Sequence, residues 1–92
     1  MRAKPLPVTA GLGELRIPGF RGPVAWRIDG DPTSLKLGHN RLKGALTTSA
    51  QVAREAFRAG EGLLVMETGD RYRLVMVGHS AGADEVFVEV RV

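Results

Sequence analysis

The sequence has 92 residues, contains no cysteine and carries a formal net charge of +3. A chain of this length suffices for one domain, and its apolar fraction of 43% is typical of a globular protein rather than a disordered one. Disulfides, a thiol nucleophile and cysteine-ligated zinc are excluded. We expect a cytoplasmic protein that contacts no membrane, because no apolar run approaches the roughly 20 residues that cross a bilayer.

The first half of the chain is basic. Residues 1–46 hold eight Lys or Arg against three Asp or Glu, for a net +5, whereas residues 47–92 hold five against seven, for −2. Such an asymmetry indicates either a surface for an anionic partner or a simple contribution to solubility. Residues 1–10 are interrupted by Pro5 and Pro7 and lack the apolar stretch of a signal peptide, so we expect an extended or flexible arm.

Short apolar stretches separated by Gly and Pro predict strands before the midpoint of the chain. Alternation of apolar and polar residues indicates three main strands, over residues 12–17, 24–28 and 41–47. Leu35 and Leu37 indicate a further short piece of strand between the second and the third.

One helix is predicted, over residues 49–59. Thr48 and Gln51 have the spacing of a capping box, in which two side chains satisfy free backbone N–H groups at the helix start. Gly60 is placed to adopt the left-handed conformation that ends a helix. An apolar stripe at helical spacing is formed by Val52, Ala53, Ala56 and Phe57.

Two strands, 63–68 and 71–77, follow the helix and flank Gly69-Asp70, which predicts a hairpin with a two-residue turn. This register places Leu63 and Val65 on the same face as Tyr72, Leu74 and Met76. A last strand over 86–92 puts its four valines on one face and Phe87 on the other.

These elements predict a single domain over residues 1–92 of the mainly β (α+β) class. We expect a small β-barrel or a rolled antiparallel sheet of five to six strands, with one helix between the third and fourth main strands. OB-type barrels carry their helix at the same place in the β-β-β-α-β-β order. That is an analogy of topology and leaves the function open.

Residues 78–82, Gly-His-Ser-Ala-Gly, match the G-x-S-x-G pattern of a nucleophile elbow, in which a strand-to-helix turn exposes the serine. Here a strand is predicted after Gly82, the chain is too short for an α/β-hydrolase sheet, and no histidine follows His79. We therefore interpret the motif as a loop, predict no catalytic residue and expect the protein not to be an enzyme.

No metal or cofactor site is predicted. Two histidines, His39 and His79, stand 40 positions apart without cysteine and do not form a recognisable zinc site. Asp29 and Asp31 begin like a calcium loop, but Ser34 and Asn40 occupy the positions that need Gly and Glu.

Basic and aromatic residues define a nucleic-acid hypothesis. Positive side chains neutralise phosphates, and exposed rings stack on bases. In an OB-like arrangement the outward face of the second and third strands and the neighbouring loops would bind a single strand. The residues that carry this hypothesis are Phe20, Arg21, Arg27, Arg41, Lys43, Arg71 and Arg73.

The other hypothesis is assembly with a protein partner or with a second copy. The strand over 86–92 is strongly β-prone, and an unprotected edge there could extend a partner's sheet, with Phe87 as an exposed anchor. Our first expectation is a non-catalytic interaction or structural module acting through protein–protein contacts, and the alternative is an OB-like domain that binds single-stranded nucleic acid. A third class, small-molecule binding inside the barrel, needs an internal cavity.

Overall fold

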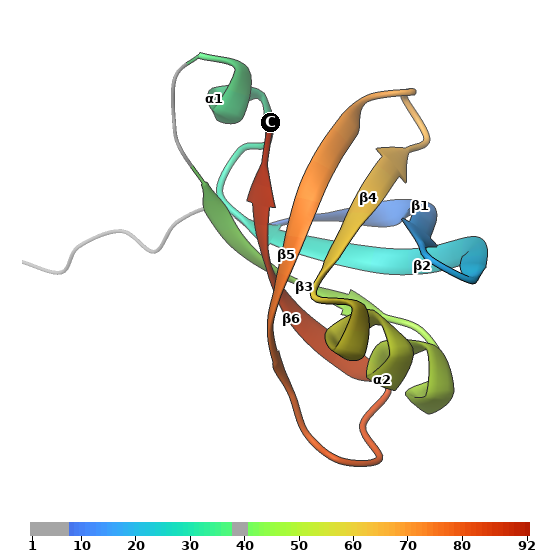
Figure 1. The fold of residues 1–92 in the computed structure, drawn as a ribbon. Helices are drawn as coiled ribbons and strands as arrows, with labels where there is room; N and C mark the ends of the chain where they lie inside the picture. Colours follow the sequence, from blue (N-terminus) through green and yellow to red (C-terminus); the bar gives the residue numbers. More distant parts are fainter. Residues whose placement is uncertain (1–7, 38–40) are drawn as a thin grey trace, which may run out of the picture.

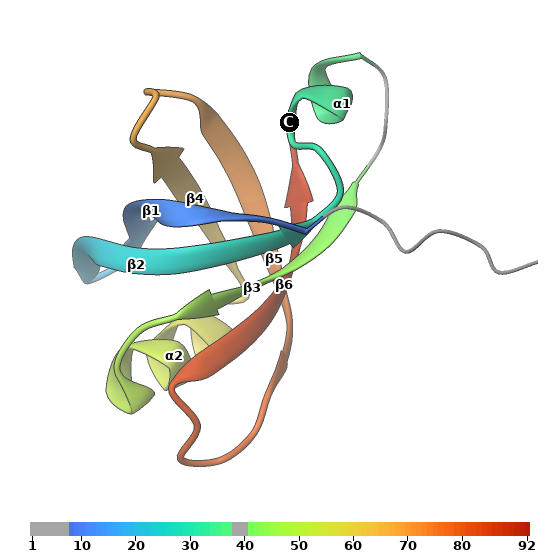
Figure 2. The ribbon, with the colours of Figure 1, turned by 180° about the vertical axis from the view of Figure 1, so that it is seen from behind.

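The computed structural model describes residues 8–37 and 41–92. In chain order the elements are β1 (Val8–Ile17), β2 (Phe20–Asp29), α1 (Thr33–Lys36), β3 (Leu42–Thr47), α2 (Ala50–Ala59), β4 (Glu61–Met66), β5 (Arg71–His79) and β6 (Glu85–Arg91). All strand pairs are antiparallel, and the strands close into one barrel in the order β1-β2-β3-β6-β5-β4 (Figures 1 and 2). The predicted mainly β barrel with a helix between the third and fourth strands is confirmed.

The two helices of the described chain lie near opposite ends of the barrel (Figure 1). Helix α2 packs against β4, β5 and β6 through Ala53 and Ala56, which are fully buried. Near the other end, Leu35 of α1 is buried and belongs to the core cluster. Each end of the barrel is therefore partly covered by a helix.

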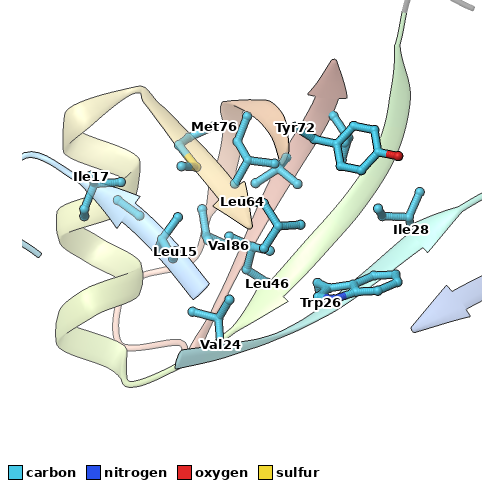
Figure 3. Packing of buried hydrophobic residues seen from close by; sticks show 14 of the residues in the cluster. Leu15, Ile17, Val24, Trp26, Ile28, Leu46, Leu64, Tyr72, Met76 and Val86 are labelled. Carbon is cyan, nitrogen blue, oxygen red and sulfur yellow. The ribbon is translucent and has the colours of Figure 1, made fainter. Parts of the chain in front are cut away.

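Apolar side chains fill the interior of the barrel, and Figure 3 shows them converging from all six strands. The largest fully buried ones are Leu15, Ile28, Leu46, Leu64, Tyr72, Leu74, Val86, Val88 and Val90. No polar or charged residue of the described chain is buried. Since side chains occupy this space, the interior gives no support to small-molecule binding inside the barrel.

Two glycines of β1 make room for the single tryptophan. The pairing sets Gly11 opposite Trp26, and a Cβ on Gly11 would lie only 2.8 Å from the Cζ2 atom of the indole. The indole Nε1 donates a hydrogen bond to the Leu12 carbonyl oxygen at 3.2 Å, and Trp26 is 9% exposed. The segment Gly11-Leu12-Gly13 is thus a strand against which the indole lies.

The first two strands are longer than predicted. Residues 8–10, expected in the arm, form the start of β1, while residues 1–7 lie outside the described chain. Residues 20–23, expected in a loop, form the start of β2. Pro23 is tolerated there because β3 pairs with β2 only from Ala25 onward, so the missing N–H removes no bond on that side. The turn between the strands is Pro18-Gly19, where Gly19 has a φ of 82°.

The prediction of a short strand at Leu35 and Leu37 was wrong, because residues 33–36 form the one-turn helix α1. Its start is held by Asp31, whose carboxylate accepts a hydrogen bond from the Thr33 N–H and whose carbonyl oxygen accepts one from the Ser34 hydroxyl. These local bonds fix a turn that apolar alternation alone does not indicate.

Most of the prediction for helix α2 is confirmed, but the residue that caps its start is a different one. The N-cap is Ser49 rather than Thr48, and its hydroxyl accepts a hydrogen bond from the Val52 N–H at 3.1 Å. Gly60 ends the helix with a φ of 81°, as expected. Of the predicted apolar stripe, Ala53 and Ala56 are buried, Val52 is half-buried and Phe57 is 42% exposed.

The predicted register of the β4–β5 hairpin was also wrong. Leu64 pairs with Tyr72, and the connection is a four-residue loop over 67–70. Leu64 and Met66 therefore face the core, whereas Leu63 and Val65 face outward and are half-buried. A run of four apolar residues, Leu63 to Met66, contains no alternation that could have distinguished the two faces.

Strand β6 has no free edge, which corrects the expectation that it could extend a partner's sheet. It pairs with β3 on one side and with β5 on the other. Its valines at 86, 88 and 90 face the core as predicted, while Val92 lies after the strand and is 59% exposed.

We predict that Gly11→Ala destabilises the protein by about 1–3 kcal/mol, because the added methyl group overlaps the indole of Trp26. Urea unfolding followed by tryptophan fluorescence measures this free energy. The matched control is Gly78→Ala, where a Cβ would make an ordinary contact of 3.6 Å with Phe87. Gly→Ala otherwise tends to stabilise through the unfolded state, so equal effects at the two positions would contradict the role given to Trp26.

Candidate protein-interaction face

The residues of the nucleic-acid hypothesis do not gather on one surface. Arg27 and Lys43 lie on the outward side of β2 and β3, and Arg41 immediately precedes β3. Arg21, Arg71 and Arg73 lie at the start of β2 and along β5. The basic residues of this hypothesis therefore lie on two different surfaces of the barrel.

Phe20 was predicted to lie in an exposed loop, and this prediction was wrong. It is the first residue of β2, pairs with Ile17, is half-buried and packs against the core. Its ring also lies over Gly22, where a Cβ would approach the ring to 2.7 Å. Phe20 is therefore part of the packing at the β1–β2 turn.

Acidic side chains lie among the basic ones on the outward surface of β2, β3 and β6. Lys43 stands between Asp29 of β2 and Glu89 of β6 in the strand pairing. Arg27 lies 4.0 Å from the carboxylate of Glu85. This surface carries both signs of charge, although the N-terminal half of the sequence is basic overall.

Glu89 is the acidic centre of this charge pattern. Its carboxylate accepts a hydrogen bond from Arg91 at 3.0 Å and lies 3.7 Å from the guanidinium group of Arg41. The hydrogen bond from Arg91, followed by the charges of Arg41, Arg91 and Lys43, lowers the pKa of Glu89 below its ordinary value of 4.5. Glu89 is therefore ionised at neutral pH.

Apolar side chains stand at the centre of the same surface. Strand pairing sets Arg27, Ala45 and Phe87 side by side on β2, β3 and β6. Ala45 faces outward but is only 2% exposed, whereas Phe87 is 44% exposed. Val77 stands next to this row at an irregularity of the β5–β6 pairing and is 52% exposed.

We call this surface the Phe87 face and define it by the outward residues of β2, β3 and β6 together with Val77. Its members are Ala25, Arg27, Asp29, Lys43, Ala45, Thr47, Val77, Glu85, Phe87 and Glu89. The same rows continue into β1, where Leu12 and Val8 are 61% and 60% exposed. The apolar surface thus extends beyond the three central strands.

The Phe87 face is hollowed beside its aromatic ring. A pocket of about 300 Å³ is bordered by Phe87 and Val77 on its apolar side. Its charged border is formed by Arg27, Asp29, Lys43 and Glu89. A small apolar group with polar neighbours would fit this shape better than an extended polyanion would.

Sequence reasoning identified Phe87 as outward-facing, and the structure places it there. It did not single out Val77, although its alternation with Tyr72, Leu74 and Met76 places that valine on the outward side. It also assigned Arg27 and Lys43 without their acidic neighbours. Two of those neighbours, Glu85 and Glu89, come from β6, more than 40 residues away in the sequence, and only the pairing reveals them.

The Gly-His-Ser-Ala-Gly motif spans the end of β5 and the following turn. Gly78 and His79 belong to the strand, and Ser80 is exposed in the turn that leads to β6. The turn is closed by a hydrogen bond from the Ala83 N–H to the Ser80 carbonyl oxygen, and His79 Nε2 lies 3.0 Å from the Ala83 carbonyl oxygen. A strand follows instead of a helix, so the backbone of a nucleophile elbow is not formed here.

Within residues 8–37 and 41–92, no three His, Asp or Glu side chains gather closely enough to hold a metal ion. His39, considered above as a partner of His79 in a zinc site, lies outside these residues. Neither α1 nor α2 is long and apolar enough to cross a membrane.

Comparison with protein-family models, with curated proteins and with solved structures found no match to this chain. Any functional conclusion therefore depends on the surfaces of the barrel.

The arginine–carboxylate pairs of the barrel surface predict loss of stability in acid. The pKa of Glu14 is lowered, chiefly by the hydrogen bond from Arg16, and that of Glu89 chiefly by the hydrogen bond from Arg91. A folded-state pKa below the ordinary 4.5 gives stability that is present above about pH 4.5 and is lost as the pH falls through the lower, folded-state value.

We expect the unfolding free energy from urea titrations to fall as the pH is lowered from 5 to 3. In Glu89→Gln that fall should be shallower than in the wild type, because one of the linked groups is gone. An unchanged pH dependence in this variant would show that Glu89 does not contribute.

Proposed function

We propose that this protein is a non-catalytic interaction module and that the Phe87 face binds a second copy of the chain. The observation that carries the proposal is the exposure of Phe87 and Val77 at the centre of an outward sheet face. Outward positions of a sheet that faces water are ordinarily polar. Fully burying an exposed phenylalanine side chain is worth about 1.5–3 kcal/mol, and the 44% of Phe87 that is still exposed leaves part of that free energy for association.

The charges around Phe87 support a second copy as the occupant. The basic residues Arg27 and Lys43 lie on β2 and β3, whereas the acidic residues Glu85 and Glu89 lie on β6. Since the face carries both signs of charge, a second copy turned in the plane of the face can bring Glu85 or Glu89 of one copy toward Arg27 or Lys43 of the other. A contact between identical surfaces requires this self-complementarity.

The closed barrel decides the kind of contact. Since β6 is paired on both sides, a partner cannot add a strand to it. The partner must instead pack its own side chains against the face, and the pocket beside Phe87 offers a place for the partner's aromatic ring. Aromatic anchors seated in pockets near the centre of a contact ordinarily dominate its free energy.

Nucleic-acid binding through the N-terminal half remains the alternative for this face. It would use Arg27, Arg41 and Lys43, but Asp29, Glu85 and Glu89 stand among them and would repel phosphates. Its affinity would fall steeply with salt. Self-association around an apolar centre would change little between 50 and 200 mM salt.

We expect Phe87→Ser to raise the dissociation constant of the dimer by on the order of 30-fold or more, the effect of losing a central aromatic anchor. Sedimentation velocity over a concentration series measures this constant. Phe57→Ser is the matched control, because Phe57 is 42% exposed against 44% for Phe87 but lies on α2.

Circular dichroism of both variants verifies that the barrel is intact. A wild-type protein that stays monomeric at millimolar concentration would overturn the proposal of a second copy. So would a dimer that Phe57→Ser weakens as much as Phe87→Ser does.

A further inference from the structure

Four arginines and Leu63 form a cross-strand row that runs over β2, β1, β4, β5 and β6. The pairing sets Arg16 of β1 between Arg21 of β2 and Leu63 of β4. Beyond Leu63 it continues to Arg73 of β5 and then to Arg91 of β6. We call these four residues, Arg21, Arg16, Arg73 and Arg91, the arginine row. Arg16 and Arg21 flank one hairpin turn, whereas Arg73 and Arg91 stand far from them in the sequence and are aligned with them by strand pairing.

The middle of this surface is formed by two arginines of β5. Arg73 donates a hydrogen bond from Nε to the Val92 backbone oxygen at 3.2 Å, and no Asp or Glu side chain of the described residues forms an ion pair with it. Arg71 stands one row further along β5, opposite Val65. Both side chains are exposed.

The ends of the row are partly neutralised. Arg16 and Arg21 share the carboxylate of Glu14, at 2.5 and 3.0 Å, and Arg91 pairs with Glu89. The shared carboxylate holds two guanidinium groups next to each other, and Arg21 remains 66% exposed. Four arginines of the row and Arg71 thus stand against Glu14, Glu61 and Glu89.

Two hollows lie along the row on either side of Gly62. One, of about 430 Å³, is bordered by Arg16, Pro18 and Leu63. The other, of about 100 Å³, is bordered by Arg73 and Arg91. A phosphate group seated in either hollow would meet at least one guanidinium group, whose planar fork matches phosphate oxygens.

We propose that the arginine row, together with Arg71, binds the phosphate backbone of single-stranded nucleic acid. The row winds round a small barrel, whose Cα radius of gyration is 12.9 Å. A duplex, with a persistence length of about 500 Å, does not follow such a curve without a large bending cost. A flexible single strand follows it and brings successive phosphates to successive arginines.

The bound strand is recognised by its backbone and not by its bases. Binding of single strands usually adds stacking of bases on aromatic rings. Here Trp26 and Tyr72 are buried inside the barrel, Phe20 packs against the core, and the exposed Phe57 and Phe87 do not border the two hollows. Affinity should therefore depend strongly on salt and weakly on sequence. This proposal does not rest on self-association, because Phe87 lies outside the row.

Substitution of Glu61 provides a test in which binding of single strands should become tighter rather than weaker. It is exposed at the start of β4 and borders both hollows, where its carboxylate would repel a phosphate. Glu61→Gln removes this repulsion with little change of shape. We expect the variant to bind single strands more tightly than the wild type, by a few fold at 50 mM salt.

The experiment is a fluorescence-anisotropy titration with labelled 20-nucleotide single strands of DNA and RNA at 50 and 200 mM salt. With a phosphate contact from four of the five arginines, Arg71 and Arg73 among them, and a slope of about 0.7 per contact, affinity should fall about 50-fold between these salt concentrations. In the double variant Arg71→Gln, Arg73→Gln the fall should be only about sevenfold, because two contacts are lost.

The matched control is Arg54→Gln, Arg58→Gln, which removes the same charge from exposed positions of α2. This control should bind like the wild type. Absence of binding at 50 mM salt would overturn the proposal, and so would an equal loss in the control. Equal affinity for poly-glutamate or for duplex DNA would also overturn it, in favour of a general attraction to anions.

The two proposals can fail separately. Phe87→Ser should keep the wild-type affinity for single strands, whereas the Arg71 and Arg73 variant should keep the wild-type dissociation constant of the dimer. Loss of nucleic-acid binding in Phe87→Ser would overturn the arginine row as the primary site.

Discussion

The pairing of β1 with both β2 and β4 is the constraint on which the rest of this structure depends. It closes the sheet, so that every strand of the barrel has two neighbours. The close approach needs small residues on the inner side of β1, where Gly11 and Gly13 lie against Trp26. The indole then spans this part of the interior and is held by its bond to the Leu12 carbonyl oxygen. Closure and tryptophan packing therefore depend on each other.

Closure also determines where this protein can act. Inner side chains are used for packing, and the backbone groups of the strands are used for pairing. A partner is left with the outward side chains and the hollows between them. These side chains fall into cross-strand rows, since the side chains of paired residues in an antiparallel sheet point to the same side. Each row brings together residues that the sequence separates widely.

The two surfaces on these rows differ in physical character. The Phe87 face has an exposed apolar centre and charges of both signs. It therefore suits a partner whose own surface combines apolar side chains with charges of both signs. The arginine row carries one sign of charge around half-buried Leu63, which suits an extended anion. Glu89 touches both surfaces, because it pairs with Arg41 at one end and with Arg91 at the other.

The sequence by itself determined the class of the fold, the place of the main helix and the outward position of Phe87. These follow from short-range physics: alternation at period two, a polar residue that caps the helix start, and a glycine free to adopt a positive φ at its end. Where local signals were weak, the prediction failed. The apolar run Leu63 to Met66 did not indicate its inner face, and hydrogen bonds to Asp31 formed a helical turn where a strand was expected.

Only the tertiary structure decided the surfaces. Arg27, Arg41 and Lys43 form a basic set in the sequence, but β6 brings Glu85 and Glu89 among them. In the same way, strand pairing aligned Arg16 with Arg73 and Arg91 across three strands, although nothing in the spacing of these residues relates them. The physical reason is that charge interactions depend on distance in space, and the closure of the barrel sets those distances after the sequence has specified each strand.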